Sequence, residues 1–415
     1  MNLIANRPDM SEWLIHFVRD RDPTTDFSGS ADAYNAQVGG LEADASAISV
    51  LRRIVRVGAL RPGYSFRPVG PGIDAEVKTT IYGGNPVVCF TEAPLQGFAQ
   101  YVQNRGRSER CAPYGVCLLK REVFAAGGRE AIYGLASSGR PPMSENSTRR
   151  RIIEPDRLPL NEQFRYVAYD PTRARLLDWS SEREWRWTAT DPDRHSIWCE
   201  GPNGIGPNPG LPLFKGMEEG GFFSQVGFIT NTRAEAEALA AELLRYRDAG
   251  NNDDCTPYSR RVLAASFVLP LDEAIASGTA RIEDLAPAHR LVATREEPTP
   301  ELLARVRAAV EKARVASTAA GSEFLQTAPR TKEGHIADAC GWANVVTTNS
   351  TSPITAALLA CSLATPMGGE YYIVDAVGKE RGDQALSYNA AVAEAACKCL
   401  CSELGKLFFV LSRWD

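Results

Sequence analysis

The sequence predicts an α+β protein with a smaller α/β domain at its C-terminal end. Short apolar and aromatic runs in the first half, such as residues 87–91, are separated by polar loops, which is typical of short strands. Residues 318–332 are polar and irregular and predict a linker. We therefore expect an N-terminal region over residues 1–317 and a small domain over residues 333–415.

Composition limits the classes of function. The chain has 415 residues, enough for two or three domains, and 44% hydrophobic and 23% charged residues are ordinary for a globular protein. The net charge of −5 gives no overall attraction to nucleic acid or anionic lipid. The sequence has no apolar run long enough to span a membrane, and we expect no secretory signal, because the first residues lack a basic region followed by an apolar core. We expect a cytoplasmic protein with no membrane contact.

The ten cysteines are scattered, and several lie inside apolar runs, which favours reduced core thiols over disulfides. Cys397, Cys399 and Cys401 form a C-x-C-x-C run. On a helix these positions spread over more than half the circumference, and no second Cys or His cluster completes a tetrahedral set. We therefore expect no metal there.

The N-terminal region divides into a core over about residues 12–190 and an α/β extension over about residues 220–317. In the core, helical spacing of apolar residues predicts a helix that ends at Gly58. Residues 201–210, rich in Gly and Pro, predict a long turn. The core elements we expect are strands at 11–19, 87–91, 114–120 and 131–133, and helices at 45–57 and 92–101.

The extension and the small domain alternate strands with helices. Thr232 and Glu235 have the spacing of a capping box, which predicts a helix that runs to about Arg247. Thr299 and Pro300 predict the start of another helix, ending near Ser317. The remaining expected elements are strands at 226–230, 261–269, 343–347, 371–374 and 407–411, and helices at 353–363 and 385–404.

The stretch at residues 176–187 is the strongest candidate for chemistry. Glu182 and Glu184 lie two residues apart among tryptophans and arginines, and in a strand such residues point to the same face. A carboxylate pair held in this way can do acid, base or electrostatic work. Alternatively, the two carboxylates pair with Arg183 and Arg186 on an exposed strand.

Other candidates have two interpretations each. His16 lies in an apolar run, where a core histidine bonded to a carbonyl is as reasonable as a ligand contact. Thr91 ends a strand and can be a plain strand residue. The arginine-rich loops at 105–110 and 149–151 are solvated surface or an edge that contacts phosphate. We expect the other histidines, His195, His289 and His335, at the surface.

Five short motifs occur in order: His-Phe in the first strand, the helix that follows, Val-Cys-Phe-Thr-Glu-Ala-Pro-Leu, Tyr-Gly-Val, and Glu-Arg-Glu-Trp-Arg. In this order they resemble bacterial abortive-infection proteins of the AbiGi type. More distantly, they resemble the ADP-ribosyltransferase fold of the DarT-type toxins. The resemblance covers roughly residues 12–190.

The resemblance implies split antiparallel sheets that bind NAD in the cleft between them. It places His16 or Arg19 against the NAD ribose and Thr91 on a second strand. It also implies that Glu184 steadies the cationic ribose as nicotinamide leaves, with Glu182 as its upstream partner. The residues expected at the site are Glu184, Glu182, His16 and Thr91 for catalysis, and His16, Arg19, Phe90, Thr91 and Trp185 for binding NAD.

We therefore expect an antiphage abortive-infection effector that uses NAD, either for ADP-ribosyl transfer to a protein or nucleic-acid acceptor or for NAD hydrolysis. The C-terminal domain would sense a phage trigger or bind a regulatory partner. One alternative is a non-catalytic module that binds a phage protein or nucleic acid through the arginine loops. Another is a metal-independent RNase toxin with His16 and Glu184 as acid and base.

Overall fold

The structure is a computed structural model that describes residues 9–21, 44–63, 66–69, 76–105, 111–136, 139–145, 150–170, 172, 180–201, 204–377 and 385–414. The protein is α+β, as the sequence predicts, and forms two compact units. Unit 1 contains Met1–Ala240 and Thr256–Val292, and unit 2 contains Ala241–Cys255 and Ala293–Asp415. This division differs from the expected boundary at residue 317.

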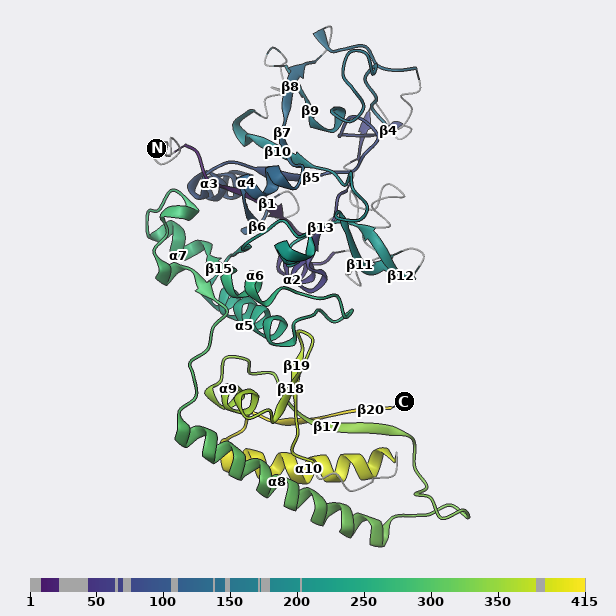
Figure 1. Cartoon of the computed structure of the whole chain (residues 1–415). Helices are drawn as coiled ribbons and strands as arrows, with labels where there is room; N and C mark the ends of the chain where they lie inside the picture. Colours follow the sequence, from purple (N-terminus) through teal and green to yellow (C-terminus); the bar gives the residue numbers. More distant parts are fainter. Residues whose placement is uncertain are drawn as a thin grey trace. The chain divides into compact units, whose positions relative to one another are not determined.

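Unit 1 is built on one sheet of eight strands in the order β16-β15-β14-β6-β1-β5-β10-β7 (Figure 1). Neighbours are antiparallel except β14 and β15, so the strands expected in two small sheets lie in one mixed sheet. The strands are β1 (Trp13–Val18), β5 (Val88–Thr91), β6 (Tyr114–Leu119), β7 (Arg129–Glu130), β10 (Glu184–Trp187), β14 (Gly227–Thr230), β15 (Phe267–Pro270) and β16 (Leu291–Val292).

The sheet of unit 1 buries side chains on both faces. On one face, Ile15 and Cys117 pack in a core with Phe98 of α3 (Leu95–Arg105) and with α7 (Leu271–Ala276). On the other face, Phe228 packs against Phe214, which in turn packs against Tyr258. The Tyr258 hydroxyl donates to the carbonyls of Val55 and Arg56, at the end of α2 (Ala47–Val57).

The helix α2 confirms its prediction, including the stop at Gly58. Gly58 has φ 73°, a left-handed conformation that only glycine adopts at little cost. A Cβ at this position would lie 2.4 Å from the Tyr258 hydroxyl oxygen. Both the backbone and the packing therefore require glycine there.

Small elements complete unit 1, and the structure of residues 196–209 differs from the prediction. The long turn predicted at 201–210 is wrong: β11 (Ser196–Gly201) and β12 (Gly204–Pro209) form an antiparallel hairpin. The smaller elements are β2 (Ala59–Leu60), β3 (Phe66–Val69), β4 (Glu76–Thr79), α4 (Lys120–Ala125), β8 (Ile132–Leu135), η3 (Gln163–Arg165), β9 (Tyr166–Tyr169), η4 (Ser180–Glu182), β13 (Leu211–Pro212), η5 (Met217–Glu219), η6 (Ile282–Asp284) and η7 (Pro287–His289).

The strand predicted at 261–269 is wrong over its first half, because the chain there forms α6 (Arg260–Ala265) before β15. The Ser259 side chain caps that helix by accepting from the Val262 amide. The capping box is confirmed at α5 (Arg233–Ala249): the Thr232 amide donates to Glu235 Oε2 at 3.1 Å, and the Glu235 amide donates to Thr232 Oγ1 at 3.4 Å.

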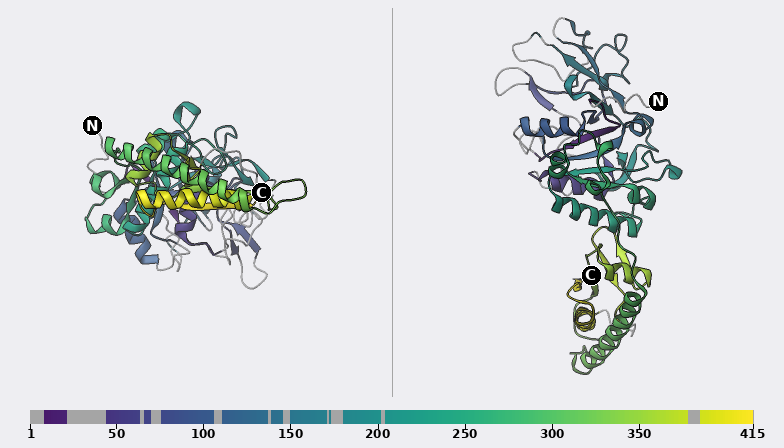
Figure 2. Two further views of the ribbon diagram at one scale, coloured as in Figure 1. Left: turned by 90° about the horizontal axis from the view of Figure 1, so that it is seen from below. Right: turned by 90° about the vertical axis from the view of Figure 1, so that its left-hand side faces the viewer.

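Unit 2 has an antiparallel four-stranded sheet in the order β18-β19-β17-β20, with α8 and α10 side by side against it (Figures 1 and 2). Alanines of both helices line the shared core, and small side chains let the two helices pack closely. The elements are α8 (Pro300–Thr327), β17 (Gly341–Thr347), α9 (Pro353–Ala360), β18 (Ala364–Met367), β19 (Tyr371–Val374), α10 (Leu386–Leu404) and β20 (Phe409–Trp414).

The helix α8 starts as predicted but does not end near Ser317. It continues to Thr327, so the linker predicted at 318–332 is wrong over most of its length. Gly321, within the predicted linker, is a buried contact position: a Cβ there would lie 2.8 Å from the Tyr388 hydroxyl oxygen of α10.

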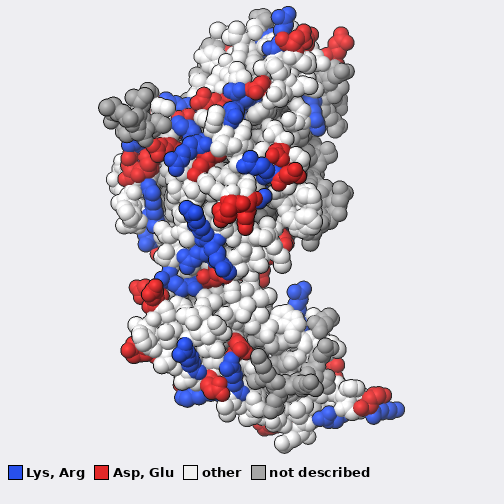
Figure 3. Space-filling view, viewed as in Figure 1, with Lys and Arg blue, Asp and Glu red and all other residues white. Residues whose placement is uncertain are grey.

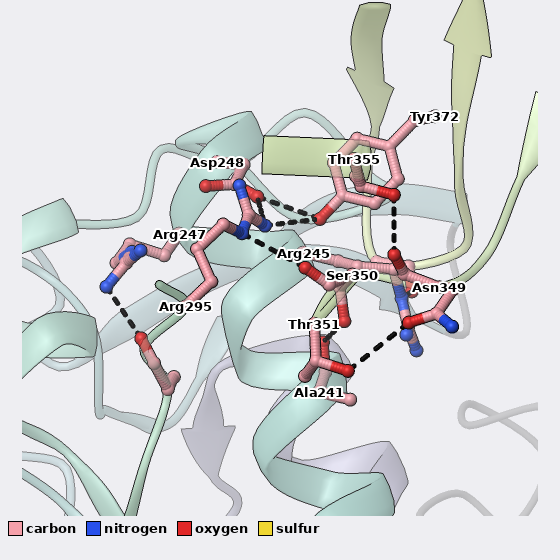
Figure 4. Close-up of polar contacts among 12 residues, drawn as sticks. Ala241, Arg245, Arg247, Asp248, Arg295, Asn349, Ser350, Thr351, Thr355 and Tyr372 are labelled. Atoms are coloured by element: carbon pink, nitrogen blue, oxygen red, sulfur yellow. Dashed lines mark hydrogen bonds and ion pairs between the residues drawn. The ribbon is translucent and has the colours of Figure 1, made fainter. Parts of the chain in front are cut away.

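A polar network within unit 2 explains why the last turns of α5 belong to it (Figure 4). Asp248 forms an ion pair with Arg295 and accepts a hydrogen bond from the Tyr372 hydroxyl at 2.8 Å. The Ser350 hydroxyl donates to the carbonyl of Ala241 at 2.8 Å. These bonds fasten the end of α5 to β19 and to the loop before α9.

Replacing Tyr372 by phenylalanine is expected to destabilise unit 2 by about 1–3 kcal/mol, because the fully buried hydroxyl also accepts from Arg295 at 3.1 Å. The measurement is the free energy of unfolding of the full chain in urea. Tyr371→Phe is the matched control, since Tyr371 is half-buried and points to the other face of β19. Equal losses in the two variants would contradict the role of the network.

Candidate functional site

A pocket of about 460 Å³ opens on one face of the unit 1 sheet, where β5 ends. This volume lies within the about 300–1,000 Å³ usual for small-molecule sites. One wall is the α3 helix with the loop before it, and another is the segment that leads into β10. The lining residues are Asp9, Phe17, Thr91, Ala93, Pro94, Gly97, Gln100, Tyr101, Asn104, Glu182 and Arg183.

The pocket combines an aromatic wall with a fixed carboxylate. The Phe17 ring stacks on Tyr101 with centroids 5.2 Å apart, and on its other neighbour Phe98 at the same distance. The Tyr101 hydroxyl donates to Glu182 Oε1 at 2.6 Å. This bond orients the Glu182 carboxylate beside the aromatic wall.

The predicted common strand for Glu182 and Glu184 is wrong. Glu182 ends the short helix η4, and β10 begins only at Glu184. Arg183, between them, has φ 44°, so the backbone turns and the two carboxylates do not follow the alternation of a strand. The Thr91 hydroxyl holds this turn by donating to the Glu182 carbonyl at 2.5 Å.

Glu184 forms a buried ion pair and is not among the pocket-lining residues. Its carboxylate accepts from Arg186 Nε at 2.8 Å and from Nη2 at 3.0 Å, with side-chain exposures of 12% and 7%. Arg186 also donates to the carbonyls of Phe164 and Tyr166. Although burial opposes the charged form, the Glu184 carboxylate raises the pKa of Arg186. The pair therefore fastens β10 to η3 and β9.

The sheet register separates the predicted site residues into two groups. Thr91 pairs with Ile15 of β1 and with Glu184 of β10, so these three point to the face that carries the pocket. His16 follows Ile15 and therefore points to the opposite face, where its ring packs 5.9 Å from that of Phe90. The structure does not bring His16 together with Thr91 and Glu184.

The two aromatic residues predicted to bind NAD lie on that opposite face. Phe90 pairs with Trp185 across the strands, and both are buried. The Trp185 indole donates to Glu92 at 3.1 Å, and Glu92 also pairs with Lys120 at 2.7 Å. These contacts make Phe90 and Trp185 core residues.

His16 fills the junction between β1 and β5, which pair in the described strands only through Ile15 and Thr91. Its Nδ1 donates to the Cys89 carbonyl at 2.8 Å, so the side chain links β1 to β5. Burial lowers the pKa of His16, and the nearby charge of Arg19 lowers it further. The hydrogen bond to Cys89 raises this pKa, but by less than burial lowers it. Arg19 follows β1 and donates to the Asp20 carbonyl at 3.4 Å.

Acidification is expected to destabilise unit 1 partly through His16. Because its pKa is lower folded than unfolded, the unfolded chain takes up the proton first, and stability falls as the pH drops below about 6.5. In His16→Asn, an amide can keep the bond to Cys89, so the loss of unfolding free energy between pH 7 and 5 should be smaller. The exposed His335→Asn is the control; an unchanged pH slope in His16→Asn would contradict the prediction.

His195 also departs from its prediction, because it is buried and not at the surface. Its ring accepts from the amides of Thr190 and Asp191 and packs 5.1 Å from Trp187. Burial lowers the pKa of His195, so it adds to the same acid sensitivity.

Of the eleven pocket residues, only Thr91 and Glu182 were among the predicted site residues, so Phe17, Tyr101 and Arg183 were missed together with six others. The sequence pattern could have indicated Tyr101, because Gly97, Tyr101 and Asn104 are spaced so that they lie on one face of α3. Arg183 was considered only as an ion-pair partner of the glutamates. Its guanidinium donates instead to Asp9, which lies far from it in the sequence.

The arginine loops are described only in part. Arg150 donates to the Gly84 carbonyl at 2.8 Å, and the Arg151 guanidinium lies 4.7 Å from the centre of the Tyr82 ring. Arg149 and residues 106–110 lie outside the described residues. On the face seen in Figure 3, basic and acidic side chains of unit 1 are interspersed.

No group of three or more His, Cys, Asp or Glu side chains suited to a metal ion occurs among the described residues. The described cysteines are free thiols, and burial together with its neighbour Cys401 raises the pKa of Cys397 to about 11. No helix in the described ranges is long and apolar enough to cross a bilayer.

No protein-family model matches the chain, and no curated protein and no solved structure shows detectable similarity to it.

Proposed function

We propose that the pocket of unit 1 is the active site of an enzyme that breaks the nicotinamide–ribose bond of NAD. The observation that carries this proposal is the Glu182 carboxylate, oriented by Tyr101 in a pocket with an aromatic wall. The resemblance of the motifs to ADP-ribosyltransferases supplies the substrate. In this proposal Glu182, and not Glu184, stabilises the cationic ribose as nicotinamide leaves.

The chemistry suits the groups present. As the glycosidic bond breaks, positive charge builds on the ribose and nicotinamide leaves as a neutral ring. A carboxylate fixed beforehand stabilises that charge more in the transition state than in the ground state. The Phe17 and Tyr101 side chains line the pocket, so an aromatic, cationic ring bound there would contact aromatic carbon.

The other predicted residues take positioning roles in this proposal. Thr91 holds the Glu182 carbonyl, and the Glu184–Arg186 pair anchors the strand that follows. The single residue pair between β1 and β5 supports a comparison with the divided sheets of ADP-ribosyltransferases. A ribonuclease that uses His16 and Glu184 as acid and base is disfavoured, because the register points the two side chains to opposite faces.

In this proposal the protein is an abortive-infection effector, and the ADP-ribosyl group goes either to a macromolecule or to water. Unit 2 is proposed to bind a trigger or a regulatory partner. The abortive-infection setting rests on the motif resemblance, and the role of unit 2 rests on the order of the domains.

The direct test is nicotinamide release from NAD by the purified full chain, with and without lysate of phage-infected cells. Release by the wild type that is lost in Glu182→Gln supports the proposal. Release that is equal in both proteins places the chemistry elsewhere. No release under either condition, with salt-sensitive binding to nucleic acid, favours the binding-module alternative.

A further inference from the structure

Arg183 is the one pocket residue with a strained backbone. Its φ of 44° lies in the left-handed region, which is costly for a residue with a Cβ and is often retained at functional sites. Two main-chain bonds hold the conformation: the Arg183 amide donates to the Ser180 carbonyl at 3.1 Å, and the Glu92 amide donates to the Arg183 carbonyl at 3.2 Å. The turn places the Arg183 side chain on the pocket lining.

The guanidinium of Arg183 holds an acidic residue of the same chain. Nη1 donates to the main-chain carbonyl of Asp9 at 2.6 Å, and Nη2 donates to Asp9 Oδ2 at 2.8 Å. The two side chains are 38% and 46% exposed, and ion pairs this exposed are weak. An external anion can therefore compete for the guanidinium.

Arginine presents its donors in a planar fork that matches carboxylates and phosphates. We propose that Arg183 forms an oxyanion-binding subsite of the pocket, and that Asp9 fills this subsite when no ligand is bound. A phosphate or carboxylate group of a ligand displaces Asp9. The subsite rests on the proposed function only where it is taken to belong to the NAD-consuming reaction, because binding of the anion does not require turnover.

The test is isothermal titration of the full chain with inorganic pyrophosphate and, in a second arm, with succinate. Asp9→Asn removes the internal competitor and should tighten anion binding about two- to fivefold, as expected for the loss of one exposed ion pair. Asp193→Asn is the matched control: it makes the same change in net charge at an exposed turn of unit 1 that is outside the pocket.

Arg183→Gln should abolish anion binding. Arg183→Gly guards against a folding artefact, since glycine accepts the left-handed backbone without strain and yet lacks the guanidinium. Retained binding in Arg183→Gly would overturn the subsite, as would equal affinities for Asp9→Asn and Asp193→Asn. The anion that binds more tightly, pyrophosphate or succinate, is the preferred ligand. Loss of its binding in the Arg183 variants supports the subsite.

The two proposals fail separately. If Asp9→Asn tightens anion binding while no variant or condition releases nicotinamide, the subsite stands and the proposed function is wrong. If nicotinamide release depends on Glu182 while the affinity for the anion is unchanged in the Asp9 and Arg183 variants, the function stands and the subsite is wrong.

Discussion

Replacing Glu182 by glutamine is expected to lower the rate of nicotinamide release about 10²–10³-fold, the usual loss when one preorganised electrostatic group is removed from an active site. Glutamine keeps a side-chain oxygen that can accept from Tyr101, so the geometry of the pocket should survive. The missing negative charge is then the main difference. The measurement is single-turnover release of nicotinamide under saturating NAD.

The stability of Glu182→Gln separates a catalytic loss from an unfolding loss. Its thermal midpoint should match that of the wild type, because only the charge of one partly exposed side chain changes. Glu237→Gln on α5, where the carboxylate is 60% exposed and outside the pocket, is the matched control and should keep full activity. A variant of Glu182 that turns over NAD at the wild-type rate would refute the assignment.

In contrast to Glu182→Gln, the variant Glu184→Gln should lose stability, with a loss of about 3–5 kcal/mol in the free energy of unfolding. The reason is that the Arg186 guanidinium, almost fully buried, would lose the charge that balances it. Urea unfolding followed by tryptophan fluorescence reports the loss, since Trp185 and Trp187 lie on the same strand. Glu162→Gln is the control, because its pair with Arg165 is more exposed and should cost at most about 1 kcal/mol.

The double variant Glu184→Leu with Arg186→Met sharpens this prediction. Replacing both charges by apolar groups removes the unbalanced charge, so the pair should be more stable than Glu184→Gln alone. Equal destabilisation by Glu184→Gln and Glu162→Gln would show that the buried pair contributes little. Loss of nicotinamide release in Glu184→Gln at temperatures where it stays folded would instead return Glu184 to the chemistry.

The sequence predicted most elements whose signals are local. The apolar spacing and Gly58 located α2, and the capping box located the start of α5. It also indicated the stretch around Glu182 as the candidate site. Patterns of this kind act within a few residues, so neighbouring residues are enough to read them.

The errors arose where contacts between distant residues decide the structure. Gly321 reads as a helix breaker, but it is the position where Tyr388 approaches α8. The left-handed Arg183 is held by Ser180 and by Glu92, and the alternation rule fails at that residue. Likewise, His16 and Thr91 both lie in the strand motifs of the predicted site, but only the register shows that they point to opposite faces.

The junction between β1 and β5 has a consequence for folding and local motion. On one side of it lie five strands, from β16 to β1, and on the other lie β5, β10 and β7. A ladder with a single residue pair resists separation less than its neighbours do, so the three-strand part can behave as its own cooperative unit. Amide hydrogens of β10 would then exchange faster than those of β6, and the two halves would gain protection in separate steps during refolding.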